Sequence, residues 1–594
     1  MTSKLFSWLG ILLMFANSLS AQNPTEKPSI KEKFTLSGTI SDAQSNETLI
    51  GVNIYIPELK TGTNTNAYGF YSITLPAGNY TLQISYLSYE TVSENIVLDQ
   101  NLKKNFKLSS QEQQLDEVVI TDQRQKTNIR KAEMSVSKLS TATIKKIPVV
   151  LGEVDVLRAL LTLPGVTNAG EGQSGFNVRG GGADQNLILL DEATIYNSSH
   201  VFGFFSVFNP DAIKDLKLYK GGIPARFGGR VSSVLDMYQK DGNSNKFSMS
   251  GGIGLITSRL LAEGPIVKDK GSFLIAGRGS YAHLFLKAAN NKNSAYFYDL
   301  NTKVNFELGP NDRLFVSGYF GRDVFSFTNK TFNFNFNWGN STGTARWNHV
   351  FNPKLFLNTT FTYSDYQYNI SNKLTGFEFN TNSNIRDANL KLDFHNNINQ
   401  NHNLRFGGNV TYHQFGVGRL KAGSTDGKIS FSAGQEFYGT ELGTYISDEY
   451  QAASNLKINA GLRLSSFISG GTTSQIGWEP RLALNYGLSD KISLKASYSR
   501  MYQYVHLISN SGLSLPTDIW YPSTAKVKPE TSDQVAGGIS WLLGKEWLIT
   551  NEYYYKWLGN QIEYKDGAQL FANDNIENEF SFGKGYAYGM EWEL

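Results

Sequence analysis

Residues 177–237 of the chain read NVRGGGADQNLILLDEATIYNSSHVFGFFSVFNPDAIKDLKLYKGGIPARFGGRVSSVLDM, and this stretch decides the fold. It is rich in glycine and mixes charged with apolar residues, so its backbone can turn sharply while parts of it are buried. Everything after it, from residue 246 to residue 594, alternates between apolar and polar residues. A glycine-rich segment in front of long alternating strands predicts a β-barrel that is closed by a plug.

The alternation is clearest in Leu456–Leu464, where Lys457, Asn459 and Arg463 stand between apolar residues. The same period of two recurs in residues 355–364, 481–488 and 491–500. One face of such strands suits lipid and the other suits water. A soluble sandwich gives the same alternation, but its strands are usually shorter and it needs no export signal. We therefore expect a mainly β protein that ends in a transmembrane antiparallel β-barrel.

The connections between these strands differ in length, which predicts two different ends of the barrel. Short turns that contain Gly, Pro, Asn or Asp are expected to face the periplasm, and they lie at residues 309–312, 351–354 and 487–490. Longer polar segments are expected to form outer loops, and they lie at residues 369–383, 422–434 and 506–531.

Composition excludes several classes of protein. The 594 residues include 55 Lys and Arg against 52 Asp and Glu, and this small net charge gives no reason to expect nucleic acid as a partner. The chain has no cysteine, so disulfides, thiolate metal sites, cysteine nucleophiles and a lipid-modified N-terminal cysteine are excluded. We expect no metal site, no cofactor and no catalytic triad, and hence no enzyme.

The N-terminus carries an export signal. Lys4 precedes the apolar run Leu5–Ala16, and small residues follow it up to Ala21. This order predicts a signal peptide over residues 1–21. The alternative, a membrane-anchoring helix, is disfavoured because the run is shorter than the roughly 20 residues that a spanning helix needs. A polar, flexible leader is expected over residues 22–33.

Residues 34–108 predict a small β-sandwich, with strands at 35–40, 52–56, 69–75, 80–86 and 94–98. The segments FTLSGTISDAQSNETLIGVNIYIP (34–57) and NAYGFYSITLPAGNYTLQISYLSYE (66–90) resemble the carboxypeptidase-regulatory-like domain, a transthyretin-like sandwich. No histidine begins an H-x-x-E or H-E-x-x-H pattern, so a zinc peptidase site has no ligands. A structural or docking module is the better interpretation.

A linker over residues 109–129 contains a strand-like segment without a local partner. This segment is Asp116, Glu117, Val118, Val119, Ile120 and Thr121. Extended segments of this kind can add to an exposed sheet edge of another protein. It resembles the energy-coupling box by which TonB grips TonB-dependent receptors, and an edge strand of the neighbouring domains is the alternative.

The plug is expected over residues 130–245. A helix is predicted within 152–166, ended by Pro164 and Gly165. Two motifs resemble the plug domain of TonB-dependent receptors, and their residues are Asn177, Arg179, Gly180, Gly181, Gly182 and Asp191 in the first, and Arg226, Gly228, Gly229 and Arg230 in the second. The resemblance implies that glycines permit sharp turns and that the arginines face carboxylates of the barrel wall. It departs from the family at Glu192, to which we assign no role.

Two rival interpretations of glycine-rich motifs are weak. Gly180–Gly182 is not followed by a helix signal, and no G-x-x-x-x-G-K-[ST] occurs, so phosphate binding is disfavoured. Residues 339–343 match G-x-S-x-G but lie in a polar stretch without the strand and helix that a nucleophile elbow needs.

The barrel is expected over residues 246–594, and residues 497–534 also resemble this receptor family. We count about 15 strands, whereas plugged transporters have about 22. We therefore expect the chain to be a fragment of a longer protein.

The resemblance implies an outer-membrane receptor, similar in architecture to SusC-like proteins, that imports a scarce nutrient when TonB, energised by ExbB and ExbD, pulls residues 116–121. Siderophore, vitamin, oligosaccharide and peptide all remain open as substrates. A surface lipoprotein of SusD type is a possible partner, beside outer-membrane lipid. The alternative function is a non-transporting receptor or adhesin on the same scaffold.

Overall fold

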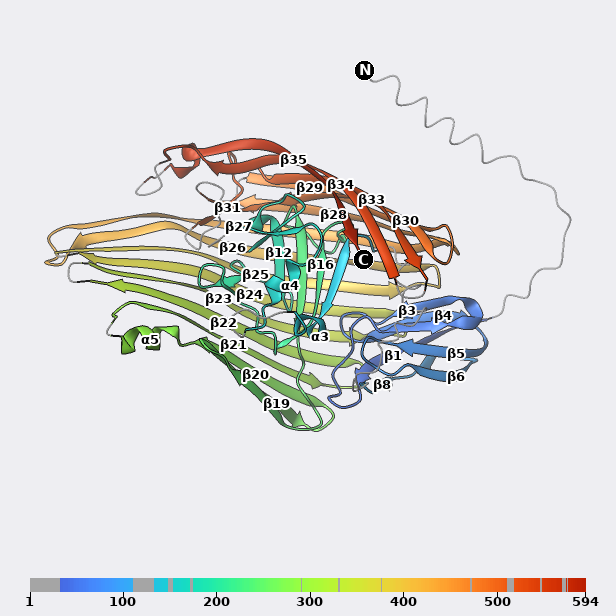
Figure 1. The fold of residues 1–594 in the computed structure, drawn as a ribbon. Coiled ribbons are helices and arrows are strands. Elements are labelled where there is room, and N and C mark those ends of the chain that lie inside the picture. The colour runs from blue at the N-terminus through green and yellow to red at the C-terminus, as the bar shows by residue number, and fades with distance from the viewer. Residues whose placement is uncertain are drawn as a thin grey trace, which may run out of the picture.

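The computed structural model describes residues 32–110, 133–147, 153–170, 175–289, 291–329, 332–374, 376–470, 473–509, 518–544, 547–568, 573 and 575–594. Three parts follow each other along the chain: a β-sandwich, a mixed plug, and a long curved sheet that we call the wall. In Figure 1 the plug lies inside the wall and the sandwich lies against one end of both. The expected fold class is confirmed.

The sandwich consists of two sheets. Its elements are β1 (Lys33–Asp42), β2 (Asn53–Ile56), η1 (Pro57–Leu59), β3 (Thr61–Asn64), β4 (Phe70–Pro76), β5 (Gly78–Ser85), β6 (Val92–Leu98), β7 (Leu102–Lys103) and β8 (Phe106–Leu108). One sheet has the order β3-β2-β5-β6 and the other β4-β1-β7, with β8 also paired to β1. Alternate residues such as Leu36, Ile54 and Leu82 are fully buried between the sheets. The five expected strands are confirmed, and three short ones were not predicted.

The plug is built on a five-stranded sheet of order β13-β12-β17-β16-β9. Its elements are β9 (Val136–Ser140), α3 (Thr141–Ile144), α4 (Val156–Leu160), β10 (Val166–Asn168), β11 (Phe176–Val178), η2 (Ala183–Gln185), β12 (Asn186–Leu190), β13 (Ala193–Thr194), β14 (Ser199–His200), β15 (Phe205–Ser206), β16 (Ile213–Tyr219) and β17 (Ser233–Gln239). Helix α4 covers only part of the expected 152–166. It starts after Asp155, whose side chain accepts a hydrogen bond from the Arg158 amide, and ends before Gly165, which adopts φ 73°.

The wall is a 16-stranded antiparallel sheet in which neighbours along the chain pair, close to the expected number of strands. Its strands are β18 (Ser248–Ile253), β19 (Thr257–Val267), β20 (Gly271–Ser280), β21 (Ser294–Glu307), β22 (Asp312–Thr328), β23 (Phe332–Val350), β24 (Leu355–Leu374), β25 (Phe377–Asn397), β26 (His402–Ser424), β27 (Ser430–Ala453), β28 (Leu456–Ser469), β29 (Thr473–Gly487), β30 (Ile492–Gln503), β33 (Glu530–Leu543), β34 (Trp547–Tyr564) and β35 (Phe580–Glu593). The end strands β18 and β35 pair with β19 and β34, and not with each other.

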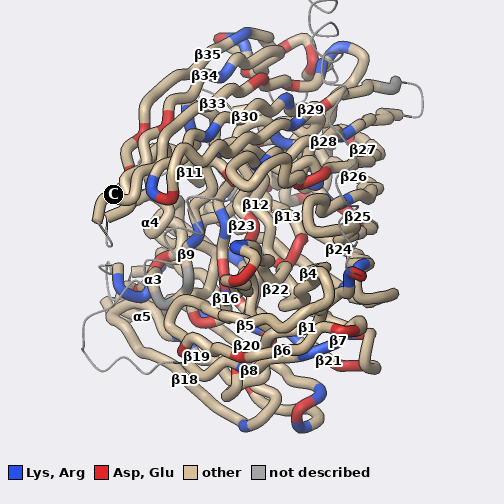
Figure 2. The backbone as a smooth tube through the Cα atoms, turned by 90° about the vertical axis from the view of Figure 1, so that its right-hand side faces the viewer, with Lys and Arg blue, Asp and Glu red and all other residues tan. Residues whose placement is uncertain are grey.

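Unlike a soluble protein, the wall exposes apolar side chains on its outer face and buries polar side chains on its inner face. On β35, Tyr588 and Trp592 point outward and are 70% and 60% exposed, whereas Glu591 between them points inward and is 7% exposed. The same holds on β28, where Leu462 and Leu464 are exposed and Arg463 is buried. The inner face is therefore polar, and the plug lies within the wall in Figure 2, which views the molecule from the sandwich end.

Two of the expected outer loops are instead continuous hairpins. Strands β24 and β25 pair up to Leu374 and Phe377, and β26 and β27 up to Gly423 and Ser430. Ladder hydrogen bonds satisfy the backbone of these polar segments without burial, so they remain strands. The described residues of the third segment, with Val505 before it, include the mostly buried pair β31 (Val505–Ile508) and β32 (Ile519–Pro522).

Helices contribute little to the described chain. Besides those of the plug and η1 of the sandwich, the described residues contain α5 (Ala282–Ala288) and the 3-10 turn η3 (Ile576–Glu579). None of the helices in the described ranges is long and apolar enough to cross a bilayer.

Candidate functional site

The contact between plug and wall is centred on Arg179, whose side chain is completely buried. Its Nε lies 2.8 Å from Glu591 Oε1, and its second amino group lies 2.7 Å from Glu552 Oε2 and 2.9 Å from Glu591 Oε2. The guanidinium also stacks 4.8 Å from the ring centre of Tyr554. We call Arg179, Glu552 and Glu591 the Arg179 clamp. Burial lowers the pKa of Arg179, but the bonds to the two carboxylates raise it above its ordinary value, so Arg179 stays charged.

Glycines bring the plug backbone close enough to the wall for this clamp. Arg179 itself has φ 49° and Gly180 has φ 72°, and a Cβ on Gly180 would lie 2.6 Å from Cβ of Ala587 on β35. A Cβ on Gly165 would lie 1.9 Å from Glu591 Oε1. The glycine-rich turn therefore sets the distance between plug and wall, as the sequence predicted for its sharp turns.

Further plug residues reinforce the clamp. Lys220 Nζ lies 2.8 Å from Glu591 Oε2, and the Ser135 hydroxyl donates to Glu552 Oε2 at 2.6 Å. On the wall, Lys556 Nζ donates to Ser232 Oγ at 3.1 Å.

Ion pairs of both polarities join the rest of the plug to the wall. They are Glu153 with Arg259 and Arg278, Asp211 with Arg259, Asp191 with Lys303, Glu192 with Lys391, and His200 with Asp323. The plug thus presents charged groups to opposite charges on the wall.

The second motif behaves differently from what the resemblance implied. Arg226 forms its ion pair with Asp236 on the plug's own β17, at 3.3 Å, and not with a carboxylate of the wall. Arg230 donates to the Gly229 carbonyl at 2.7 Å and faces the rings of Trp520 and Tyr196. Neither side chain therefore repeats the Arg179 arrangement, although the second motif also touches the wall, where Arg481 donates to the Phe227 carbonyl at 3.5 Å.

Other predicted residues of the two motifs contact the wall or neighbouring parts of the plug. Gly228 lies against Arg463 of the wall, where a Cβ would be 2.2 Å from Nε, and Gly229 has φ 82°. Asn177 pairs with Thr167 between β11 and β10. Asp191 Oδ1 accepts the Gln239 amide at 3.2 Å. Residues 116–121, the predicted coupling box, lie outside the described residues.

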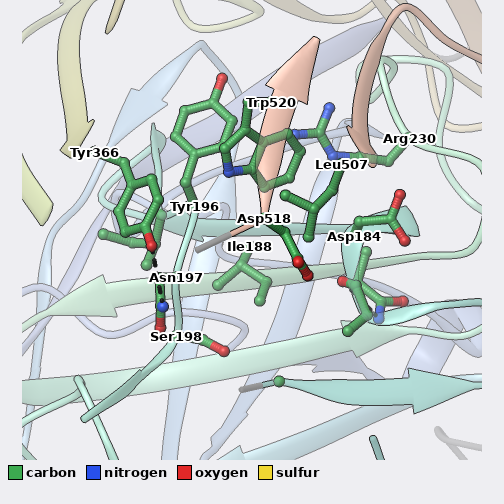
Figure 3. A pocket seen from close by; sticks show the side chains of 14 residues that line it. Asp184, Ile188, Tyr196, Asn197, Ser198, Arg230, Tyr366, Leu507, Asp518 and Trp520 are labelled. Carbon is green, nitrogen blue, oxygen red and sulfur yellow. Dashed lines mark hydrogen bonds between the residues drawn. The ribbon is translucent and has the colours of Figure 1, made fainter. Parts of the chain in front are cut away.

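Arg230 lines a recess between the plug and the pair β31 and β32 (Figure 3), and β31 lies toward the end of the wall away from the sandwich in Figure 1. The walls of the recess come from the plug, from β24 and from the pair β31 and β32 with the preceding Asp518. Its side chains combine aromatic rings with carboxylates and one guanidinium, namely Tyr196, Tyr366, Trp520, Asp184, Asp518 and Arg230. Such a mixture can stack on a planar group and fix its polar atoms.

Asp184 in this recess is partly buried and has an unusual protonation equilibrium. Burial, with the nearby Glu530 carboxylate, raises the pKa of Asp184 to about 7. Gln503 Nε2 lies 3.4 Å from Asp184 Oδ2 and opposes this increase.

A serine, a histidine and a glutamate lie beside the recess in an order that resembles a nucleophile triad. His506 Nε2 lies 2.8 Å from Ser523 Oγ, and His506 Nδ1 lies 3.3 Å from Glu530 Oε1. His506 and Ser523 have no exposed surface, so no substrate carbonyl can reach the hydroxyl. Glu530 Oε2 accepts a hydrogen bond from Gln185 of the plug at 2.9 Å, so this group is another contact that holds the plug to the wall.

The G-x-S-x-G match is not a nucleophile elbow either, because its Ser341 lies within strand β23.

Sequence reasoning missed the wall partners of the plug. Glu552 and Glu591 stand at inward positions of β34 and β35, and inward carboxylates between aromatic residues were the available signal. Among the residues that the structure describes, no group of three His, Asp or Glu side chains could hold a metal ion.

Family models match three consecutive parts of the chain. Residues 36–120 match the CarboxypepD_reg-like domain and residues 128–233 match the TonB-dependent receptor plug domain. Residues 276–594, more than half of the chain, match the TonB-dependent receptor-like β-barrel. The chain belongs to the TonB-dependent receptor family. None of the curated proteins compared with this receptor chain matches it.

Solved receptor structures share the fold at low sequence identity. A variant of the ferric enterobactin receptor of Pseudomonas aeruginosa has 16% identity and a TM-score of 0.57, covering 80% of this chain and 79% of that one. The siderophore receptor PirA of Acinetobacter baumannii has 13% identity and a TM-score of 0.56, with coverages of 80% and 79%. The alcaligin outer-membrane receptor FauA of Bordetella pertussis has 15% identity and a TM-score of 0.53, with coverages of 78% and 77%.

Replacing Arg179 should loosen the plug. In Arg179→Gln Glu552 loses its cation and Glu591 keeps only Lys220, and breaking a buried ion pair on one side costs about 3–5 kcal/mol. We expect faster amide hydrogen exchange in β9 and β16 of the purified receptor. The control Lys373→Gln removes a cation from an exposed pair with Glu378, worth at most about 1 kcal/mol, and should leave exchange unchanged. Equal exchange in both variants would contradict an anchoring role for Arg179.

Asp184 should make the receptor less stable as the pH rises. Between the ordinary pKa of an aspartate and about 7, the folded state holds a proton that the unfolded state has released, so the free energy of unfolding falls through this range. We expect a lower thermal midpoint at pH 8 than at pH 5, and a smaller difference in Asp184→Asn. The exposed Asp426→Asn serves as control, because the hydrogen bond from the Ser424 hydroxyl lowers the pKa of Asp426 instead of raising it. An unchanged pH dependence in Asp184→Asn would exclude this assignment.

Proposed function

We propose that this chain forms an outer-membrane receptor that imports a scarce nutrient when TonB, energised by ExbB and ExbD, pulls on residues 116–121. The supporting observation is the plug itself, which fills the space inside the wall and is held by hydrogen bonds and ion pairs such as the Arg179 clamp. The sandwich would lie in the periplasm, on the side of the short turns. Membership of the TonB-dependent receptor family supports the energy source.

The polar character of the plug contacts suits a plug that must move. Hydrogen bonds and ion pairs exchange for bonds to water at a modest net cost, whereas an apolar interface would expose hydrocarbon surface. A pulled plug can therefore leave the wall while water hydrates the inner face. The outward apolar band, with residues such as Tyr588 and Trp592, keeps the wall in lipid during this change.

The nutrient would first bind in the outward recess lined by Trp520, Tyr366 and Arg230. This position couples binding to the plug, because Arg230, Asp184 and Tyr196 of the recess belong to the plug. A lipoprotein of SusD type would cover the same outer end. Siderophores, the ligands named for the similar structures, are one candidate class beside vitamins, oligosaccharides and peptides.

Deleting residues 116–121 should separate binding from import. Cells that express the deletion should still bind the substrate but accumulate none of it, because the pull on the plug is lost. Uptake can be measured with labelled ferric enterobactin, ferric alcaligin, cobalamin and maltooligosaccharides as probes. A deletion of equal length at residues 122–127 is the control. Accumulation that survives the first deletion would refute energy coupling, and binding without accumulation in the intact receptor would favour a non-transporting receptor.

Trp520 should contribute to binding of the probe that is taken up. Trp520→Ala removes a buried ring from the recess and should weaken binding at least about tenfold, since a stacked aromatic anchor is worth about 2 kcal/mol. Trp478→Ala removes a ring that is 60% exposed on the outward face and should leave the dissociation constant unchanged. Equilibrium binding to purified receptor measures both. Equal constants would place the substrate elsewhere.

A further inference from the structure

The sandwich reaches into the junction of plug and wall through Tyr68, which is 7% exposed. The Tyr68 hydroxyl donates to Glu192 Oε1 of the plug at 2.8 Å. Its ring stacks on Phe356 of the wall at 5.5 Å, and the Arg346 guanidinium lies 4.7 Å from the ring centre. One side chain of the sandwich therefore contacts both parts that must separate during transport.

Glu192 is the plug residue on which this junction converges. Its carboxylate also accepts bonds from Asn358 Nδ2 at 3.0 Å and Lys391 Nζ at 3.1 Å, both on the wall. Burial by itself raises the pKa of Glu192, but Lys391, Arg346 and the Tyr68 hydroxyl lower it to about 2, so the carboxylate is ionised. Asp191 and Glu192 have φ values of 47° and 73°, a strained corner that these contacts hold in place.

A second contact runs through Glu47 of the sandwich. Glu47 Oε1 accepts the backbone amide of Asp241 at 2.7 Å and lies 3.3 Å from Lys214 Nζ. Lys214 and the wall residue Lys303 both pair with Asp241, at 3.1 and 3.0 Å. Charges thus alternate from the sandwich through the plug to the wall.

Backbone contacts complete the docking surface. The Ser244 amide donates to the Ser45 carbonyl at 3.0 Å, and Asn245 Nδ2 donates to the Gln44 carbonyl at 2.7 Å. Ser244 and Asn245 connect the last plug strand to the first wall strand, so the sandwich is fastened at the point where the two parts join.

The connectivity places this docking surface in the path of a pull. The predicted coupling residues 116–121 lie between β8 of the sandwich and β9 of the plug. Strand β8 pairs with the end of β1, with Leu108 beside Asp42, and β1 leads directly into the turn that carries Ser45 and Glu47. Strand β9 is the edge strand of the plug sheet. A force on residues 116–121 therefore loads the sandwich docking and the plug edge together.

We propose that the docked sandwich is a latch that keeps the plug closed, and that it must undock before the plug leaves the wall. The latch consists of Tyr68 and Glu47 with their plug and wall partners. This inference rests on the proposed function for the origin of the force, but the latch can be measured without substrate or TonB. If the sandwich is only a spacer, its contacts carry no load.

Force spectroscopy on the full chain in lipid nanodiscs tests the latch, with a peptide handle inserted between Val118 and Val119. In Glu47→Gln with Tyr68→Phe, the docking contacts lose a charge and a hydroxyl while the rings still stack. We expect the first detachment at constant force to be at least about tenfold faster than in the wild type. The matched control is Glu58→Gln with Tyr80→Phe, two sandwich residues whose partners, Thr81 and Pro76, lie inside the sandwich. Equal rates in both variants would overturn the latch.

An engineered disulfide across the docking surface tests the latch in the opposite direction, because it prevents undocking. The chain has no native cysteine, so only the introduced pair can form this disulfide. Ser45→Cys with Ser244→Cys joins two residues whose backbones are hydrogen-bonded, within reach of a disulfide. When this variant is oxidised, the early detachment should disappear and the plug should leave the wall only at higher force. Reduction should bring back the early detachment and the lower force. Thr35→Cys with Thr74→Cys, which joins β1 to β4 inside the sandwich, should behave as the wild type. If the oxidised Ser45→Cys, Ser244→Cys receptor extended under force like this control, the latch would be refuted.

The two hypotheses fail separately. Loss of uptake on deleting residues 116–121 would stand even if the sandwich carried no load, whereas uptake that survives the deletion would refute the proposed function without changing the detachment rates.

Discussion

The reversed polarity of the wall is the constraint on which the rest of this structure depends. A sheet that is apolar outside must bury charged and amide side chains inside, and these groups need partners when water is displaced. The inner face carries Arg463, Glu479 and Arg481, all of them buried. The plug surface must therefore offer matching charges, while its apolar residues pack partly in a core around α4 and partly against the wall, as Phe227 and Val231 do in one cluster with Met501.

The Arg179 clamp shows how charges are matched where the plug backbone lies directly against the wall. The backbone at Gly165 and Gly180 approaches β35 without side chains, and Arg179 then reaches two carboxylates on neighbouring strands. Because a buried ion pair adds little net stability but is costly to break on one side only, it specifies the position of the plug more than it adds stability. The same reasoning applies to Glu192 and Lys391, where the plug meets β25.

Particular elements show what could be predicted and what could not. Wall strands were predictable because a period of two is a local pattern, and the glycines of the first plug motif were predictable because sharp turns need them. The helix after Asp155 is shorter than predicted because α4 must end where the chain turns toward Glu591. Arg226 resembles Arg179 in its local motif, yet it pairs with Asp236, because the direction of a side chain depends on where the surrounding loop lies.

The sequence by itself determined the alternating faces of the wall strands, since a period of two is a local pattern, and its motifs indicated the order of sandwich, plug and wall through their resemblance to known receptors. The tertiary structure alone decided which charges meet. Arg179 lies more than 370 residues from Glu552, and Tyr68 lies 124 residues from Glu192. Contacts at such separations depend on the shear of the wall and the depth of the plug, which no local pattern encodes. The glycine-rich stretch predicted a plug, and its neighbours in space show how that plug is held.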